Sequence, residues 1–457
     1  MISAIRRSPI SGPKAFAIVW FGQVISFIGS GLTSFALGVW VYQMTGSITE
    51  FSLISLFFTL PGVVLGPLAG ALIDRWDRRW TMILSDAGSS LSTLFILLLL
   101  TAGRLELWHI YLAVFMNGVF GSLGLTTFTA STTQLIPKEQ FGRASGLLQI
   151  VQVGQFLISP FVAGALIGAI GLQGVILIDF ATFFFAIFTL LIVRIPRPVI
   201  TAEGQAGKGS LLREATYGWR YIKVRPGLVA LIVLFAFANF TTEMSLVLFT
   251  PLLLSFTSPA VLGTAMSLGS IGYLAGSIVM SVWGGAKRRI NAVIGSMLLL
   301  GLFMGLIGLR ASIPLVIVCV FMTSFWVPIV ASSNQVIWQS KVAPDVQGRV
   351  FAIRRTIVLA TPLLAYLVAG PLADNVFEPL LAVNGPLAGS VGQIIGVGQG
   401  RGIGLLLISM GLLLVLVTAI SCLYPRLRHV EDELPDVVFE KPILVDSGSP
   451  VVNLAVN

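Results

Sequence analysis

The chain alternates between long apolar stretches and short polar connections. Twelve of the stretches are long enough to cross a bilayer, which takes about 20 predominantly apolar residues in a helix. Helices satisfy their own backbone hydrogen bonds in lipid, so the pattern predicts an all-α integral membrane protein. The twelve predicted spans are 15–43, 51–73, 80–101, 107–134, 142–169, 173–195, 226–250, 260–283, 289–309, 312–339, 347–370 and 402–424.

The spans fall into two sets of six with a repeated loop pattern. A polar segment at 196–225, with an amphipathic helix expected around 211–221, separates the sixth span from the seventh. Short loop sequences recur at equivalent places in the two sets: Arg78-Arg79 as Arg288-Arg289, and Gly142-Arg143 as Gly348-Arg349. We therefore predict two pseudo-symmetric six-helix bundles related as parallel repeats. The predicted division is a terminus at 1–14, a first bundle at 15–195, a linker at 196–225, a second bundle at 226–424 and an acidic tail at 425–457.

Lysine and arginine lie mostly on one side of the predicted spans. Of the 28 basic residues, 23 fall on the side that holds both termini and the linker, and three fall on the opposite side. By the positive-inside rule, both termini are expected in the cytoplasm and the protein in the cell (inner) membrane. The net charge of +9 then serves topology and contact with anionic lipid, so nucleic acid is not an expected partner.

The composition excludes a water-soluble domain. Hydrophobic residues make up 56% of the chain and charged residues 10%, whereas ordinary soluble domains have about 25% charged residues. Only two histidines and two isolated cysteines are present, so neither a metal site nor a cofactor is expected. The sequence contains no HExxH, GxSxG or P-loop motif, which argues against an enzyme.

The loop after the second span carries the clearest family signature. Gly70 to Arg79 reads GALIDRWDRR, which resembles the loop motif of the major facilitator superfamily, with Asp77 where that family usually has glycine. WFGQVISFIGSGL, VYQMTGS, WGGAKRR and PDVQGRVFA are similar to the branch that contains macrolide-efflux proteins and the enterobactin exporter, and the resemblance covers 15–424. It implies the two-bundle fold of that superfamily and transport by alternating access.

The resemblance also implies a conformational latch in this loop, made of Gly70, Asp74, Arg75 and Arg79. Asp74 and Arg75 are expected to govern the switch between outward- and inward-facing states, with Asp74 capping the start of span eleven near Gly348. Such a bond exists only when the two halves close on the cytoplasmic side. For Arg79, an effect on topology alone is the alternative.

A second motif, in span five, favours export. GQFLISPFVAG, from Gly154 to Gly164, resembles the exporter signature of the superfamily, with Ser159 and Pro160 in place of its glycine-proline pair. Proline removes a helix hydrogen bond and small residues permit close helix contact. Ser159, Pro160 and Gly164 therefore predict a bend that packs tightly against the other half.

Ionisable residues at membrane depth are rare and are functional candidates. Glu243 lies in the outer half of span seven, which lines the central cavity in the family that the chain resembles. A partly desolvated carboxyl there can exchange a proton in one state and face a dry interior in the other, so Glu243, Asp179 and Asp86 are proton-coupling candidates. The alternative for each is a carboxyl hydrogen-bonded to a neighbouring helix. The residues at this depth are Asp86, Asp179, Glu243, Arg354 and Arg355.

Further polar side chains are candidates to line the substrate cavity. One of the adjacent arginines Arg354 and Arg355 is expected to reach back to the lipid headgroups. The other, taken as Arg355, is expected to face inward and form a gate pair or meet an anionic substrate. For the amides, hydrogen bonding between packed helices is the alternative. The cavity candidates are Gln23, Asn117, Gln149, Gln152, Asn239 and Arg355.

The sequence therefore predicts a monomeric secondary active transporter that exports amphipathic drugs or secondary metabolites, such as macrolides, siderophores or peptides, in exchange for protons. An importer, a lipid flippase and a non-transporting scaffold on the same fold are the alternatives. Two segments lie outside the bundles. The glycine-rich outer loop at 371–401 is expected to be a lid or a mobile connection, and the acidic tail from Glu431 is expected to be disordered.

Overall fold

The computed structural model describes residues 12–73, 76–137, 140–193, 219–342 and 344–433. Within these ranges the chain is helical and contains no strand. Eleven of the described helices are long and apolar enough to cross a membrane, and one of these contains two spans. The twelve predicted spans and the all-α membrane fold are therefore confirmed. Asp74, Arg75 and most of the predicted linker helix lie outside the described residues.

The first lobe contains the first six spans in five helices. The helix α5 holds two of them, because Gly171 adopts φ 66° and ψ −178° and interrupts the helical geometry between the spans. Glycine tolerates this positive φ, which other residues rarely adopt. The helices of this lobe are α1 (Pro13–Thr45), α2 (Ile48–Ile73), α3 (Arg78–Thr101), α4 (Leu107–Leu135) and α5 (Phe141–Ile192).

The second lobe contains the other six spans as separate helices. Proline occupies one of the first two positions of several of them, where its missing N–H costs no helical hydrogen bond. The helices are α8 (Pro226–Leu254), α9 (Pro259–Trp283), α10 (Arg289–Leu309), α11 (Ile313–Lys341), α12 (Pro344–Leu372) and α15 (Arg401–Leu423).

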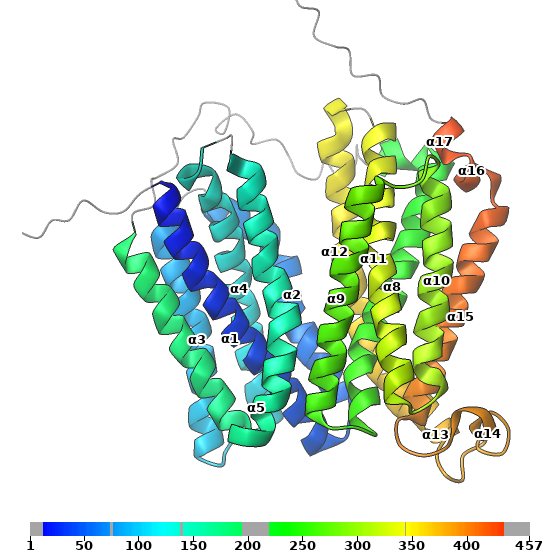
Figure 1. The fold of residues 1–457 in the computed structure, drawn as a ribbon, viewed down its shortest axis with the longest axis horizontal. Helices are drawn as coiled ribbons and strands as arrows, with labels where there is room; N and C mark the ends of the chain where they lie inside the picture. The colour runs from blue at the N-terminus through cyan, green and yellow to red at the C-terminus, as the bar shows by residue number, and fades with distance from the viewer. Residues whose placement is uncertain (1–11, 74–75, 138–139, 194–218, 343, 434–457) are drawn as a thin grey trace, which may run out of the picture.

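The two lobes lie side by side and approach each other more closely at one end (Figure 1). We call this end, which carries residues 373–400, the loop end, and the opposite end, where α8 begins, the linker end. The lobes make contact mainly through two helix pairs, α2 with α12 and α5 with α9, with smaller contacts such as that of α2 with η2 (Ala373–Phe377). Figure 1 shows the ribbons of the lobes diverging from the loop end toward the linker end.

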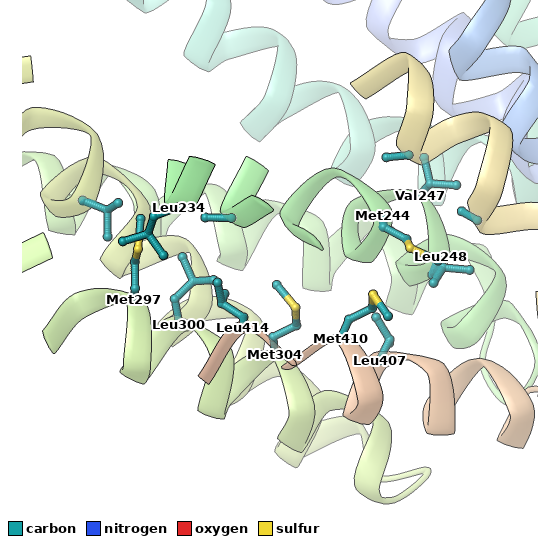
Figure 2. Packing of buried hydrophobic residues seen from close by; sticks show 14 of the residues in the cluster. Leu234, Met244, Val247, Leu248, Met297, Leu300, Met304, Leu407, Met410 and Leu414 are labelled. Atoms are coloured by element: carbon teal, nitrogen blue, oxygen red, sulfur yellow. The ribbon is translucent and has the colours of Figure 1, made fainter. Parts of the chain in front are cut away.

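Apolar side chains fill the interior of the second lobe. Met244 and Leu248 of α8 pack with Met304 of α10 and Met410 of α15 in one buried cluster (Figure 2). The helices α10 and α15 also meet at glycines, and a Cβ added at Gly308 would lie 2.0 Å from the Gly404 carbonyl oxygen. Close packing of this kind makes α8, α10 and α15 a rigid unit.

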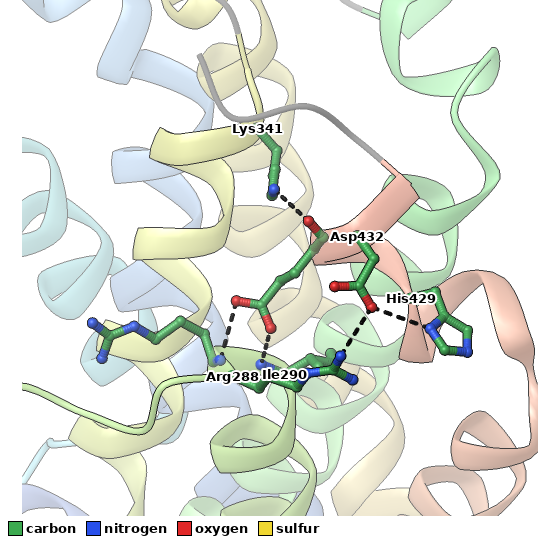
Figure 3. A network of polar contacts seen from close by, with 7 residues as sticks. Arg288, Ile290, Lys341, His429 and Asp432 are labelled. Atoms are coloured by element: carbon green, nitrogen blue, oxygen red, sulfur yellow. Dashed lines mark hydrogen bonds and ion pairs between the residues drawn. The ribbon is translucent and has the colours of Figure 1, made fainter. Parts of the chain in front are cut away.

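The start of the predicted tail is folded onto the second lobe. Two short helices, α16 (Pro425–Arg428) and α17 (Val430–Glu433), follow the last span. The Glu431 carboxylate accepts hydrogen bonds from the backbone N–H groups of Arg289, at 3.1 Å, and Ile290, at 3.0 Å, in the first turn of α10 (Figure 3). The expectation of disorder from Glu431 is thus wrong for residues 431–433, because a helix N-terminus binds the carboxylate. Residues 434–457 lie outside the described range.

The long outer loop is also folded. It contains the π-helical turn η2 (Ala373–Phe377) and the short helices α13 (Glu378–Leu380) and α14 (Gly392–Ile395). The Glu378 carboxylate accepts hydrogen bonds from the N–H groups of Gly400 and Ile403 at the start of α15. These bonds fix the loop against the second lobe, which differs from the expectation of a mobile connection.

Candidate functional site

Glu243 and Tyr366 form a hydrogen-bonded pair where the two lobes meet. Glu243 on α8 is half-buried, and Tyr366 on α12 is 8% exposed. The Tyr366 hydroxyl donates to Glu243 Oε2 at 2.9 Å. The helix α12 also packs against α2 of the other lobe, on which Thr59 lies close to Tyr366. A carboxyl group of the second lobe is thereby connected to a helix of the first.

Asn239 and Asn117 are two of the amides that were predicted to line the substrate cavity. Asn239 lies four residues before Glu243 on α8, so the two share a helix face. Asn117 lies in α4 of the first lobe, and both amides are half-buried. Their role as cavity-lining residues stays a prediction. Gln149 and Gln152 belong to α5, but their side chains lie outside the described part of the chain.

Arg354 belongs to a polar cluster within the second lobe. Its guanidinium donates to Gln335 Oε1 of α11 at 2.7 Å and lies 5.6 Å from the centre of the Trp338 ring. The Trp338 indole N–H in turn donates to Asn334 Oδ1 at 3.0 Å. These contacts place Arg354 inside the lobe, whereas Arg355 is exposed.

Arg355 shares a face of α12 with Tyr366. The two residues are eleven positions apart, which is three helical turns and about 17 Å along the axis. Because Tyr366 faces α2 of the other lobe, Arg355 lies on the face of α12 that is directed toward that lobe. The inward position of Arg355 and its contact with substrate stay predictions.

Gln23 and Asp86 pair inside the first lobe. The Gln23 amide donates to Asp86 Oδ2 at 2.9 Å, and the two side chains are 3% and 8% exposed. Gln23 was predicted to line a cavity between the lobes. This prediction is wrong, because its amide instead hydrogen-bonds a buried carboxyl on α3. The bond fits the alternative interpretation of Asp86 as a residue that holds two helices together.

Asp179 is fully buried in a polar cluster of the first lobe. It comes from the second span of α5, and its carboxylate oxygens lie 3.4 Å from the hydroxyls of Ser30 on α1 and Thr93 on α3. The cluster joins three helices of one lobe, which is what structural hydrogen bonding predicts. Proton exchange by Asp179 or Asp86 stays untested.

The exporter-like motif of α5 lies at the contact with α9. Ser159 Oγ donates to the Ile28 carbonyl of α1 at 2.9 Å. A Cβ added at Gly164 would lie 2.6 Å from the Pro259 carbonyl, and one at Gly263 would lie 2.1 Å from the Pro160 carbonyl. The two helices thus touch backbone to backbone, as the small residues predict. The chain remains helical through Pro160.

At the loop end, Asp374 joins the two lobes. Its carboxylate accepts hydrogen bonds from the Ser47 hydroxyl at 2.9 Å, the Ile48 N–H at 3.1 Å, and the Thr49 N–H and hydroxyl at 2.8 and 2.7 Å. Ser47 lies just before α2 and the other donors belong to its first turn, where unpaired N–H groups attract negative charge. Sequence reasoning missed this contact, because Asp374 lies in a loop, outside the predicted spans.

At the linker end, the family-like loop is only partly described. Asp77 caps α3 by accepting from the N–H groups of Arg79, at 3.0 Å, and Trp80, at 3.4 Å. Its φ of −69° explains why the position does not require glycine. The Arg79 guanidinium donates to the carbonyls of Leu190 and Leu191, all within the first lobe. Gly70 lies near the end of α2, and the latch formed with Asp74 and Arg75 stays a prediction.

Tyr366, Trp338 and Gln335 were also missed as site residues. Each lies in a predicted membrane span. The signal that could have identified them is a polar side-chain group within an otherwise apolar span. Among the described residues, no group of three His, Cys, Asp or Glu side chains is placed to hold a metal ion.

Two six-helix lobes that touch at one end, with ionisable side chains at their contact, define a two-lobed membrane transporter. The sequence model of the Major Facilitator Superfamily matches residues 19–358, and the chain belongs to this family of transporters. The predicted family and fold are therefore confirmed.

Relatives of known name come from the predicted branch. Macrolide efflux protein A of Streptococcus pyogenes is 27% identical over 371 residues, covering 79% of this chain and 90% of that protein. The multidrug efflux pump Tap of Mycolicibacterium fortuitum is 25% identical, covering 78% of this chain and 88% of that protein. The enterobactin exporter EntS of Escherichia coli is 26% identical over 435 residues, covering 93% of this chain and 95% of that protein.

Solved transporter structures share the fold. The nucleoside transporter NupG has a TM-score of 0.69 at 12% identity, covering 89% of this chain and 99% of that chain. A bacterial homolog of the human lysosomal transporter Spinster, in an inward-facing and unoccupied conformation, has a TM-score of 0.67 at 14% identity, covering 93% and 99%. At these identities the likeness establishes the architecture alone.

Proposed function

We propose that this chain is a proton-driven exporter of amphipathic small molecules. Three relatives with broad coverage are named as efflux or export proteins. Their names give macrolides, multiple drugs and enterobactin as cargo, which are not one chemical group. We expect an apolar interlobe surface with scattered amides, which would suit such cargo. We place both termini in the cytoplasm, from the excess of basic residues at the linker end, and we take the working unit to be the monomer.

Alternating access provides the mechanism. The lobes touch at the loop end through Asp374 and through the backbone contact of α5 with α9. With the linker end in the cytoplasm, the structure corresponds to a state closed toward the outside. Export then requires these loop-end contacts to break while the linker end closes.

The pair of Glu243 and Tyr366 is the observation that carries the proton-coupling proposal. An ionised Glu243 accepts a hydrogen bond from Tyr366, whereas a protonated carboxyl can donate one instead. Tyr366 lies on α12, which packs against α2 of the other lobe, so a change in the partner of Tyr366 affects a helix at the contact between the lobes. Protonation of one carboxyl can in this way bias which end of the transporter is open.

The test is dye efflux from proteoliposomes that hold the purified protein and an imposed pH gradient. Wild-type protein should export the dye only while the gradient persists. Glu243→Gln should lose gradient-driven efflux while it keeps dye binding, and Tyr366→Phe should weaken the response to the gradient. Glu106→Gln, at an exposed carboxylate of the first lobe, is the matched control and should behave as wild type. Efflux that continues after the gradient is collapsed, or normal gradient-driven efflux by Glu243→Gln, contradicts the proposal.

A further inference from the structure

Arg354 is a cation at membrane depth with no counter-charge among the side chains that the structure describes. It lies five residues, about 8 Å, beyond Arg349 along α12. Its guanidinium is half-buried and contacts a neutral amide, Gln335, and the ring of Trp338. No carboxylate with a described side chain lies within ion-pair distance of it. A desolvated charge is costly unless an opposite charge pairs with it, so the site favours an anion.

A small pocket of about 10 Å³ lies beside this guanidinium, between α8, α11 and α12. Its walls are apolar except at Arg354 and Asn334. The Trp338 side chain is 1% exposed and is held by its hydrogen bond to Asn334, so its ring has a fixed orientation. The lining residues are Ile232, Phe235, Ala236, Asn334, Trp338, Arg354, Ile357 and Val358.

The geometry points to a cargo subsite at Arg354 that binds the carboxylate of an aromatic amphipath. The planar guanidinium can form two parallel hydrogen bonds with a carboxylate. Phe235, Ile357 and Val358, which are half-buried or exposed, offer an apolar surface beside the pocket for the aromatic part of the same molecule. This inference rests on the proposed function, because it names a class of cargo that the exporter accepts.

The subsite is separate from the proton-coupling pair. Ala236 in the pocket lies seven residues before Glu243 on the same face of α8, about 10 Å away along the helix axis. Anion binding at Arg354 can therefore be measured even if the protein proves unable to transport. For this reason, a failure of the proposed export function can be distinguished from a failure of this inference.

The experiment compares two probes that differ only in charge, 1-pyrenebutyrate and its neutral amide 1-pyrenebutanamide. Binding is followed by energy transfer from tryptophan to pyrene, with the protein in lipid nanodiscs and with protein-free nanodiscs as the background. Wild-type protein should bind the carboxylate at least about tenfold more tightly than the amide. Arg354→Gln should bind both equally, and Arg354→Lys should keep part of the preference because it keeps the charge.

Two further variants separate the anion site from folding and from overall charge. Gln335→Glu gives Arg354 a carboxylate partner within the protein, so it should lose the preference although the arginine remains. Arg310→Gln removes an exposed positive charge at the loop end of the same lobe and should keep the preference. Size-exclusion profiles and melting temperatures report whether each variant is folded. Equal wild-type affinities for the two probes, or a preference that persists in both Arg354→Gln and Gln335→Glu, overturns the inference.

Discussion

The carboxylate of Asp374 is expected to hold the loop end closed, and Asp374→Asn tests this directly. The substitution keeps the size of the side chain but removes its charge. In the structure the carboxylate accepts bonds from the Ile48 and Thr49 N–H groups and from the Ser47 and Thr49 hydroxyls. All four donors belong to the other lobe, so the bonds exist only while the loop end is closed.

The size of the effect follows from the type of contact. A side-chain cap at a helix N-terminus contributes about 1 kcal/mol, and a negative charge there adds about 0.3–1 kcal/mol. The amide of asparagine retains one acceptor, so a net loss of about 1–2 kcal/mol is expected. This loss shifts the equilibrium between closed and open loop ends by about 5–30-fold.

Cysteine labelling measures the shift. In a background with Cys319 and Cys422 replaced by alanine, Ser52→Cys reports on the α2 and α12 contact and Ser267→Cys on the α5 and α9 contact. Both serines are buried at the loop end, at 0% and 7% exposure. A membrane-impermeant thiol reagent should label both reporters faster in Asp374→Asn by the factor given above.

The two reporters distinguish lobe opening from local fraying. If the lobes move as rigid bodies, both labelling rates rise together, whereas fraying of α2 raises only the rate at Ser52→Cys. Asp432→Asn removes a carboxylate that pairs with Arg288 at the linker end, and it should leave both rates unchanged. Unaltered labelling in Asp374→Asn, or an increase at one reporter alone, refutes the role of Asp374 as an interlobe latch.

Two more variants probe how the lobes meet and how the second lobe holds together. Gly263→Val places a side chain where even a Cβ would lie 2.1 Å from the Pro160 carbonyl. It should therefore prevent loop-end closure and abolish dye efflux, with faster labelling of Ser267→Cys; normal efflux contradicts this. Glu431→Gln weakens the cap of α10, and it should lower the unfolding free energy by about 1 kcal/mol, measured as a reduced melting temperature. A melting temperature equal to that of wild type means that the tail does not support the lobe.

The hydropathy pattern predicted the fold well because lipid imposes one solution on each apolar stretch. All twelve spans were found from length and polarity alone, including the two joined in α5, because Gly171 lies between apolar runs of spanning length. The ionisable residues in the membrane were also identified from the sequence, because a charged residue is easily recognised within an apolar span. Glu243, for example, was identified without knowledge of its neighbours.

The partners of these residues were not predictable, because helix packing brings together residues far apart in sequence. Tyr366 lies 123 positions from Glu243, and nothing in the apolar pattern fixes which faces of α8 and α12 meet. Gln23 was misplaced for the same reason, since its bond to Asp86 depends on how α1 packs against α3. Asp374 lies in a loop, where composition gives no sign that a helix N-terminus of the other lobe is near.

The prediction that the tail is disordered from Glu431 rested on its composition alone and did not consider the repeat between the two lobes. In the first lobe, Asp77 binds the N–H groups of Arg79 and Trp80. The repeated loop pattern pairs Arg79 with Arg289, but the second lobe has basic residues, Lys287 and Arg288, before that position.

Glu431 supplies the missing carboxylate, because it binds the N–H groups of Arg289 and Ile290 (Figure 3). Each lobe thus satisfies the start of its third helix with a carboxylate of its own. The loop-end carboxylate of Asp374 differs in kind, because it caps a helix of the opposite lobe. A carboxylate within one lobe stabilises that lobe in every state, whereas one that crosses between the lobes favours a single state. This distinction is why Asp374→Asn should change the conformational equilibrium, while Glu431→Gln should change only stability.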